Sequence, residues 1–300
     1  MRFSLLVIFM ALLLSACGDG GSGSGGSGTT GSFSLGITDG PVDSAMQVVV
    51  EFDAIHLEAA GGEEVDFELA TVQSLDLLSL QGSASASLLD GVSVPAGNYI
   101  AIRLSVNAEA NVRDSYVVLD DGSEEELRIP SGSQTGLKLN HAFTVAVGST
   151  TDFTIDFDLR KSITNPPGQA GMIMRPTLRL VDNLTVGSVS GAVSSVLINE
   201  ACADVAANDG AVYLYAGTAE FAEDVFGEET DPITTALVDD EWNYEIGFVA
   251  AGQYTAAYTC ENDLDDPEVD DELTFIGFTS ISITADSNTV QDFDAPPVVL

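Results

Sequence analysis

The chain has 300 residues, of which 47 are acidic and 9 are basic, so its formal net charge at pH 7 is −38. A protein with this charge repels nucleic acid and anionic lipid faces, and it attracts cationic partners and divalent metal ions. Nucleic acid is therefore excluded as a partner.

The first residues have the pattern of an export signal. A charged start at Arg2 precedes the apolar run Phe3–Leu14, whose twelve residues are too few to span a bilayer. Small residues in the triplet Leu-Ser-Ala then come directly before Cys17. We expect residues 1–16 to be a signal peptide that is removed after export.

The Leu-Ser-Ala triplet before Cys17 resembles the bacterial lipobox. The resemblance implies that Cys17 is lipidated and becomes the N-terminus of the mature protein, with 47 acidic and 8 basic residues remaining. Two or more acyl chains anchor a protein stably, and no later apolar run has spanning length, so the lipid anchor attaches the protein to a membrane without crossing it. The residue after Cys17 is glycine, not the aspartate that resembles an inner-membrane retention signal. The predicted location is therefore the cell envelope, at the outer membrane.

A flexible linker is predicted at residues 17–31. The segment Gly18–Gly31 has eight glycines among fourteen residues and cannot bury apolar surface. As a flexible coil it reaches roughly 20 Å on average and about 50 Å when fully stretched. We expect it to hold the folded part of the chain away from the lipid surface.

Residues 32–184 are predicted to form an antiparallel β-sandwich, because short β-rich runs recur there between Gly-, Asp- and Pro-rich turns. The predicted strands are Phe33–Thr38, Gln47–Glu58, Asn98–Val106, Ser115–Leu119, Glu125–Ile129, Ala142–Val147, Thr151–Leu159 and Met172–Val181. Only Gln73–Leu80 is predicted as a short helix.

Alternation is clearest near the end of this first domain. The residues Phe153, Ile155, Phe157 and Leu159 fall on one face of a strand, which we assign to the core. The opposite face carries Thr154, Asp156 and Asp158, and we expect it to be solvated or paired with Arg160 and Lys161. An acid and base pair for glycoside hydrolysis is the less favoured interpretation, because carboxylate pairs are common in a chain with 47 acids.

Residues 185–300 are predicted to form a second, smaller sandwich, so the fold class is all-β with two antiparallel β-sandwich domains in tandem. Its predicted strands are Gly187–Ile198, Ala211–Gly217, Ile233–Val238, Trp242–Phe248, Gln253–Cys260, Leu273–Thr284 and Thr289–Phe293. An Ala-Gly-x-Tyr corner precedes a strand in each domain, at Tyr99 and Tyr254. A tyrosine at such a corner can bury its ring and bond its hydroxyl to the backbone, so both are interpreted as structural.

The second domain has 24 acidic residues and no lysine or arginine. Its compact state must tolerate self-repulsion that counter-ions screen, which favours adaptation to a salty medium over specific cation binding. Cys202 and Cys260 are the only cysteines besides Cys17, and exported proteins keep disulfides. We predict that these two cysteines pair.

Several ordered motifs in residues 31–183 resemble the bacterial lipoprotein family named domain of unknown function 4382. They are Gly36-Ile37-Thr38-Asp39-Gly40-Pro41, Leu75-Asp76-Leu77-Leu78, Pro95-Ala96-Gly97-Asn98-Tyr99 and Asp156-Phe157-Asp158-Leu159-Arg160-Lys161-Ser162. The following domain resembles the carboxypeptidase-regulatory or prealbumin-like sandwiches in its strand Ala211–Tyr215 and its tyrosine corner. The resemblance implies fold and location, and it implies no activity.

The two histidines, His56 and His141, lie in strand-like runs and are interpreted as surface or edge residues. A Ser-His-Asp triad needs an exposed, strained serine, and the chain has no Gly-x-Ser-x-Gly elbow. Zinc spacings, P-loops and dinucleotide fingerprints are also absent from the sequence. We therefore predict that the chain is not an enzyme.

The best metal candidate is the acidic segment 261–272, which follows Cys260. Calcium prefers six to eight oxygen ligands from flexible loops. The candidate ligands are Glu261, Asp263, Asp265, Asp266, Asp270 and Asp271. The segment lacks EF-hand spacing, so a charged loop without an ion is the favoured interpretation and calcium is the alternative.

The sequence supports three hypotheses about function. The first is a non-enzymatic lipoprotein that presents loops or sheet edges to an envelope protein, a polysaccharide or another cell. The second is a calcium-dependent binding module. The third is a hydrolase built from carboxylates without histidine, which requires a cleft lined by acids with raised pKa values.

Overall fold

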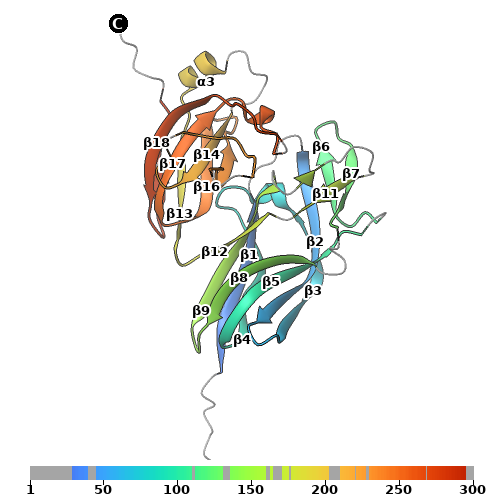
Figure 1. The fold of residues 1–300 in the computed structure, drawn as a ribbon. Coiled ribbons are helices and arrows are strands. Elements are labelled where there is room, and N and C mark those ends of the chain that lie inside the picture. Colours follow the sequence, from blue (N-terminus) through green and yellow to red (C-terminus); the bar gives the residue numbers. More distant parts are fainter. Residues whose placement is uncertain are drawn as a thin grey trace, which may run out of the picture.

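The computed structural model describes residues 29–39, 45–109, 112–130, 136–159, 163–164, 171–175, 177–202, 210–219, 221–227, 230–267 and 269–294. The predicted signal peptide, Cys17, Arg160 and Lys161 lie outside the described residues. Within them, no helix has the length and apolar character needed to cross a membrane. Strands dominate the described part of the chain, which confirms the all-β fold class (Figure 1).

The strands before residue 183 form two sheets. The four-stranded sheet has the order β12-β9-β1-β4, made of Leu178–Asp182, Thr150–Phe157, Thr30–Asp39 and Ala86–Pro95. The eight-stranded sheet has the order β10-β11-β7-β6-β2-β5-β8, with β3 paired to β2. Its strands are Ile163–Thr164, Met172–Met174, Glu124–Arg128, Tyr116–Leu119, Ala45–Ala59, Gly97–Asn107, Leu137–Val145 and, for β3, Glu64–Asp76.

One apolar core fills the space between these two sheets. Phe153, Ile155, Phe157 and Leu159 are all buried in it, which confirms the core face predicted from their alternation. Aromatic rings from both sheets meet there, with the Phe33 centroid 5.8 Å from that of Phe143. Such inward-facing alternating residues are what hold two sheets face to face.

The strands after residue 185 form two further sheets. The three-stranded sheet has the order β16-β13-β19, made of Asn243–Ala250, Val186–Ala192 and Asn288–Val290. The four-stranded sheet has the order β15-β14-β17-β18, made of Thr234–Leu237, Ala211–Ala216, Gly252–Thr259 and Phe275–Ile283. Figure 1 shows these strands as a body of their own, and their buried side chains form clusters distinct from the first core.

A disulfide joins Cys202 to Cys260 in this second group, as the sequence predicted, with the two Cα atoms 5.5 Å apart. It links the end of the helix α3, Ser195–Ala201, to the end of β17. Both cysteines are buried in the second core.

The tyrosine corners have the predicted structural role. The Tyr99 hydroxyl donates to the Pro95 carbonyl at 2.8 Å, and the Tyr254 hydroxyl donates to the Ala250 carbonyl at 2.7 Å. Both rings are buried. The same local device therefore closes a strand entry in each half of the chain.

Several predicted elements were wrong at their boundaries. The predicted strand Met172–Val181 is two strands in different sheets, β11 and β12, and the sequence has Pro176, which cannot donate to a strand ladder, between them. The predicted strand Gly187–Ile198 ends at Ala192, and α3 follows because the Ser194 side chain caps its first turn by accepting from the Val196 amide.

The first sandwich also contains strands that its sequence pattern did not predict. Strands β3 and β4 were not predicted, and the predicted helix Gln73–Leu80 is the end of β3 followed by the 3-10 turn Leu77–Leu80. Strand β1 begins at Thr30, inside the predicted linker, and pairs in parallel with β9. Two other pairs, β7 with β11 and β13 with β19, are also parallel in these mainly antiparallel sheets.

The two sandwiches touch near the 3-10 turn of the first. Ser83 donates a hydrogen bond to Glu245 of β16, and Gly247 packs directly against the Gly82 carbonyl, where a Cβ atom would clash. Gly82 also has a positive φ of 66°. Glycine at both positions therefore permits the close approach of the two backbones.

Candidate functional site

Three buried or partly buried carboxylates converge in the second sandwich. One oxygen from each of Asp224, Asp265 and Asp271 lies within 4.8 Å of the others. Asp224 is 3 % exposed and Asp265 is 7 % exposed. A buried carboxylate is costly unless hydrogen bonds, a proton or a cation compensate it.

Hydrogen bonds hold this cluster in place. Asp265 accepts from the Tyr213 hydroxyl at 2.6 Å and from the Val225 amide at 3.1 Å, and Asp224 accepts from the Asp271 amide at 2.5 Å. Burial raises the pKa of the Asp224 carboxyl, and the charges of Asp265 and Asp270 raise this pKa further, against the lowering effect of the Asp271 amide. The surroundings of Asp224 therefore disfavour its charged form relative to a solvated carboxylate, and a bound cation would offset this effect.

The predicted calcium ligands only partly meet. Of the six, the structure brings Asp265 and Asp271 together, and it adds Asp224, which the sequence analysis missed. Glu261 instead accepts from the Thr274 amide at 2.6 Å, and the Asp266 amide donates to Asp271 at 2.8 Å. Asp263 and Asp270 are exposed.

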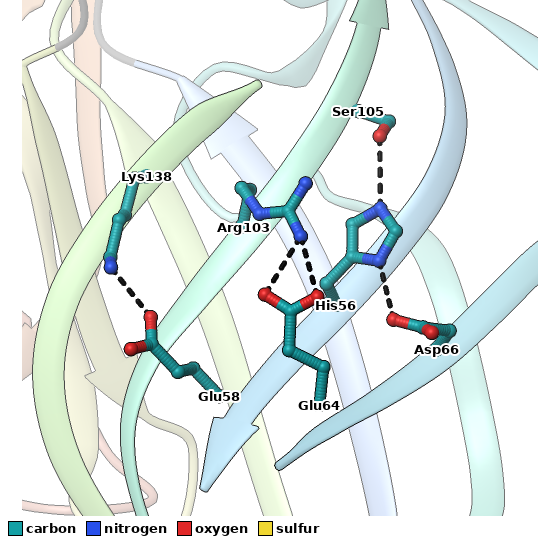
Figure 2. Close-up of polar contacts among 7 residues, drawn as sticks. All are labelled: His56, Glu58, Glu64, Asp66, Arg103, Ser105 and Lys138. Atoms are coloured by element: carbon teal, nitrogen blue, oxygen red, sulfur yellow. Dashed lines mark hydrogen bonds and ion pairs between the residues drawn. The ribbon is translucent and has the colours of Figure 1, made fainter. Parts of the chain in front are cut away.

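A second polar group lies on the outer face of the eight-stranded sheet, across strands β3, β2, β5 and β8 (Figure 2). Arg103 donates to both carboxylate oxygens of Glu64, at 2.9 and 3.0 Å, and Lys138 contacts Glu58 at 2.5 Å. His56 lies at the centre of this face. Its side chain is 15 % exposed.

The two ring nitrogens of His56 both have partners. Nδ1 lies 2.6 Å from the Asp66 carboxylate, and Nε2 lies 3.0 Å from the Ser105 hydroxyl. This has the connectivity of a Ser-His-Asp triad, which the sequence analysis did not anticipate. Acyl transfer needs, in addition, donors aimed at an oxyanion, and Ser105 lies within the regular strand β5, opposite Ala54 of β2. The arrangement therefore does not favour hydrolysis. His141, the other histidine, is exposed.

A groove of about 590 Å³ lies between the two sandwiches. Its charged lining residues are all acidic: Asp39, Asp156, Asp239, Glu245 and Asp292. Threonine and serine side chains from both sandwiches complete the polar wall. Such a lining favours neutral polar or cationic ligands over anionic ones.

Asp156 was expected to face solvent or to pair with Arg160 and Lys161; it is not solvent-facing, and the two expected partners lie outside the described residues. The second sandwich partly covers this face, and Asp156 pairs with Arg179 at 2.5 Å, its side chain 12 % exposed. Burial raises the pKa of the Asp156 carboxyl, while the Arg179 guanidinium opposes this rise. Because an arginine already engages Asp156, the groove gives little support to a carboxylate-based hydrolase.

One family model matches the first sandwich. Residues 30–176 match the family described as "Domain of unknown function (DUF4382)". This confirms, for that part of the chain, the family resemblance drawn from its motifs. Among curated proteins, no match to the chain was found.

Solved structures resemble the chain only distantly. The Bacillus anthracis TIE protein is 10% identical with a TM-score of 0.21, and the match covers 88% of this chain and 33% of that one. The chain thus spans about a third of that protein's length. A minor pilin of Streptococcus agalactiae is 10% identical with a TM-score of 0.20, covering 89% and 98% of the two chains. The major pilin subunit BcpA of Bacillus cereus is 10% identical with a TM-score of 0.21, covering 88% and 98%.

These TM-scores are too low for the likenesses to carry an argument about function. The resemblance of residues 185–300 to carboxypeptidase-regulatory or prealbumin-like sandwiches stays a prediction.

Proposed function

We propose that this chain is a non-enzymatic binding or structural module of the bacterial cell envelope, held at the outer membrane by lipid on Cys17. The single observation that carries the proposal is the Leu-Ser-Ala-Cys17 motif after an apolar run and before a glycine-rich segment. The anchor would leave two β-sandwiches at the end of a flexible linker. Sandwiches of this kind can present loops, edges and grooves to a partner.

The groove between the sandwiches is the surface that best fits a binding role. It is concave, and it is lined by hydroxyls and carboxylates from both halves of the chain. An envelope polysaccharide offers hydroxyl groups to such a wall, and a cationic segment of an envelope protein offers charge complementarity. Nucleic acid is disfavoured by the net charge of −38.

The anchor is tested by replacing the lipidated residue. We expect Cys17→Ser to move the protein from the detergent phase to the aqueous phase in a phase-partitioning assay, because one sulfur carries the acyl anchor. Folding should be unchanged, since the linker separates Cys17 from the first strand. Partitioning of the variant at the wild-type level would contradict the proposal.

Calcium-dependent binding is the second candidate function. The observation that favours it is the convergence of Asp224, Asp265 and Asp271 in a domain without a lysine or arginine. An all-oxygen ligand set suits calcium. Calcium bound there would offset the repulsion among these carboxylates. Residues 185–300 contain no lysine or arginine that could do so.

Thermal melts in matched sodium, magnesium and calcium series test this candidate. If the site is specific, calcium should stabilise the domain far more than magnesium does. Calcium at a hundredfold excess over its dissociation constant should add about 2.7 kcal/mol to the free energy of unfolding. Asp224→Asn should remove the calcium effect, while Asp263→Asn, an exposed neighbour outside the cluster, should keep it. Identical melting curves in magnesium and calcium would show that the ions act only by screening charge, and would exclude a specific calcium site.

A further inference from the structure

His56, Glu64 and Asp66 offer three potential metal ligands from two neighbouring strands. His56 of β2 lies directly opposite Asp66 of β3, and Glu64 precedes Asp66 by two positions, on the same face of the sheet. One ligand atom from each residue lies within 4.8 Å of the other two. Ligands around a tetrahedral zinc ion are roughly 3.3 Å apart, so small side-chain rotations would bring these three together.

The imidazole ring is held between two polar partners. Figure 2 shows His56 between Asp66 and Ser105, with Nδ1 facing the carboxylate and Nε2 facing the hydroxyl. At 2.6 Å from a carboxylate oxygen, Nδ1 is the donor in the metal-free protein. A metal bound at Nδ1 would replace this proton, and the ring would then keep its one proton on Nε2 and donate it to the Ser105 oxygen. Metal-bound histidines usually have such a partner on the second nitrogen, and it fixes both tautomer and ring orientation.

The charges around the ring are compatible with a divalent cation. Asp66 and Glu64 carry two negative charges, and Arg103 offsets part of that charge by its two bonds to Glu64. A carboxylate oxygen has more than one lone pair, so Glu64 can keep a bond to Arg103 and also face a metal. The wider protein, with a net charge of −38, attracts cations to its surface.

We propose that His56, Glu64 and Asp66 form a binding site for a transition-metal ion of the zinc class. One imidazole nitrogen and two carboxylate oxygens suit zinc and its first-row neighbours, whereas calcium and magnesium prefer oxygen alone. The site lies on a solvated sheet face, so water would complete the coordination. Ser105 is a positioning residue that acts through the ring of His56.

Zinc titration of the full chain tests this site. The protein is purified without a histidine tag and titrated at physiological ionic strength in excess calcium, which occupies oxygen-only sites. We expect the wild type to bind one zinc ion and His56→Gln to lose at least about tenfold in affinity. His141→Gln is the matched control, because it removes the only other histidine and should leave the affinity unchanged.

Two further variants and a spectroscopic measurement extend the test. Asp66→Asn should weaken zinc binding even if His56→Gln fails to fold, and Ser105→Ala should weaken it by about tenfold to hundredfold with the fold intact. In nuclear magnetic resonance spectra, zinc should shift the imidazole signals of His56 and leave those of His141 in place. Wild-type protein that binds no zinc in excess calcium, or His56→Gln protein that binds it as tightly as the wild type, would overturn the proposal.

Discussion

In the first sandwich a partly buried carboxylate meets an arginine, whereas in the second sandwich buried carboxylates meet one another. Asp156 pairs with Arg179, while Asp224 and Asp265 lie in a cluster within a domain that has no basic residue. The first sandwich thus has basic residues that can pair with some of its carboxylates. The second must rely on hydrogen bonds, protons or cations, so its stability should depend more strongly on the solution and on covalent restraint.

Removal of the disulfide is expected to have the largest effect on the stability of the second sandwich. Replacing Cys202 and Cys260 by serine should destabilise the second sandwich by about 4 kcal/mol, since the bridge closes a separation of 58 residues in the unfolded chain. Trp242 is the only tryptophan, so its fluorescence reports unfolding of the second sandwich. Hydrogen exchange in β2 and β5 of the first sandwich should be unchanged, because the two sandwiches have separate cores. Equal loss of protection in both sandwiches would show that they unfold together.

The tyrosine corners should give equal effects in the two sandwiches, because their geometry is the same. Tyr99→Phe and Tyr254→Phe each remove one hydroxyl-to-carbonyl bond and should each cost about 1 kcal/mol of unfolding free energy. Regional hydrogen exchange measures each effect where it occurs. A loss confined to one of the two variants would show that the corners are not equivalent.

Acid should stabilise the second sandwich through Asp224, and this is the smallest of the expected effects. The pKa of Asp224 is raised in the native state, which therefore binds a proton more tightly than the unfolded state. Stability should rise as the pH falls from neutrality through the raised native pKa of Asp224. The rise should end near the pKa of the same group in the unfolded chain, about 3.9.

Denaturant unfolding, followed by Trp242 fluorescence without divalent cations, measures this effect. The slope of stability against pH should be shallower in Asp224→Asn than in the wild type. Parallel slopes would exclude Asp224 as its source.

The sequence predicted elements well where local pattern and burial agree. Strand β2 begins and ends within one or two residues of its predicted bounds. The alternation of residues 153–159 identified a core face correctly. Strand β3 was missed although Val65, Phe67 and Leu69 alternate with acidic residues and an alanine, because the acids weakened its β signal.

Contacts between distant segments were beyond sequence reasoning. Asp224 joins Asp265 and Asp271 through packing of a segment, residues 221–227, that has no regular periodicity. The pairing of His56 with Asp66 depends on the register of β3, a strand that was not predicted. Arg179 lies opposite Asp156 because β12 pairs with β9, and strand order is not encoded locally.

Both sandwiches, however different, are proposed to share one attachment to the membrane. Mass analysis of the N-terminal peptide of the protein isolated from its native membrane tests this claim most directly. We expect a peptide that begins at Cys17, lacks residues 1–16 and carries the added mass of acyl chains. A mature protein that begins elsewhere, or that has Cys17 without acyl mass, would contradict it.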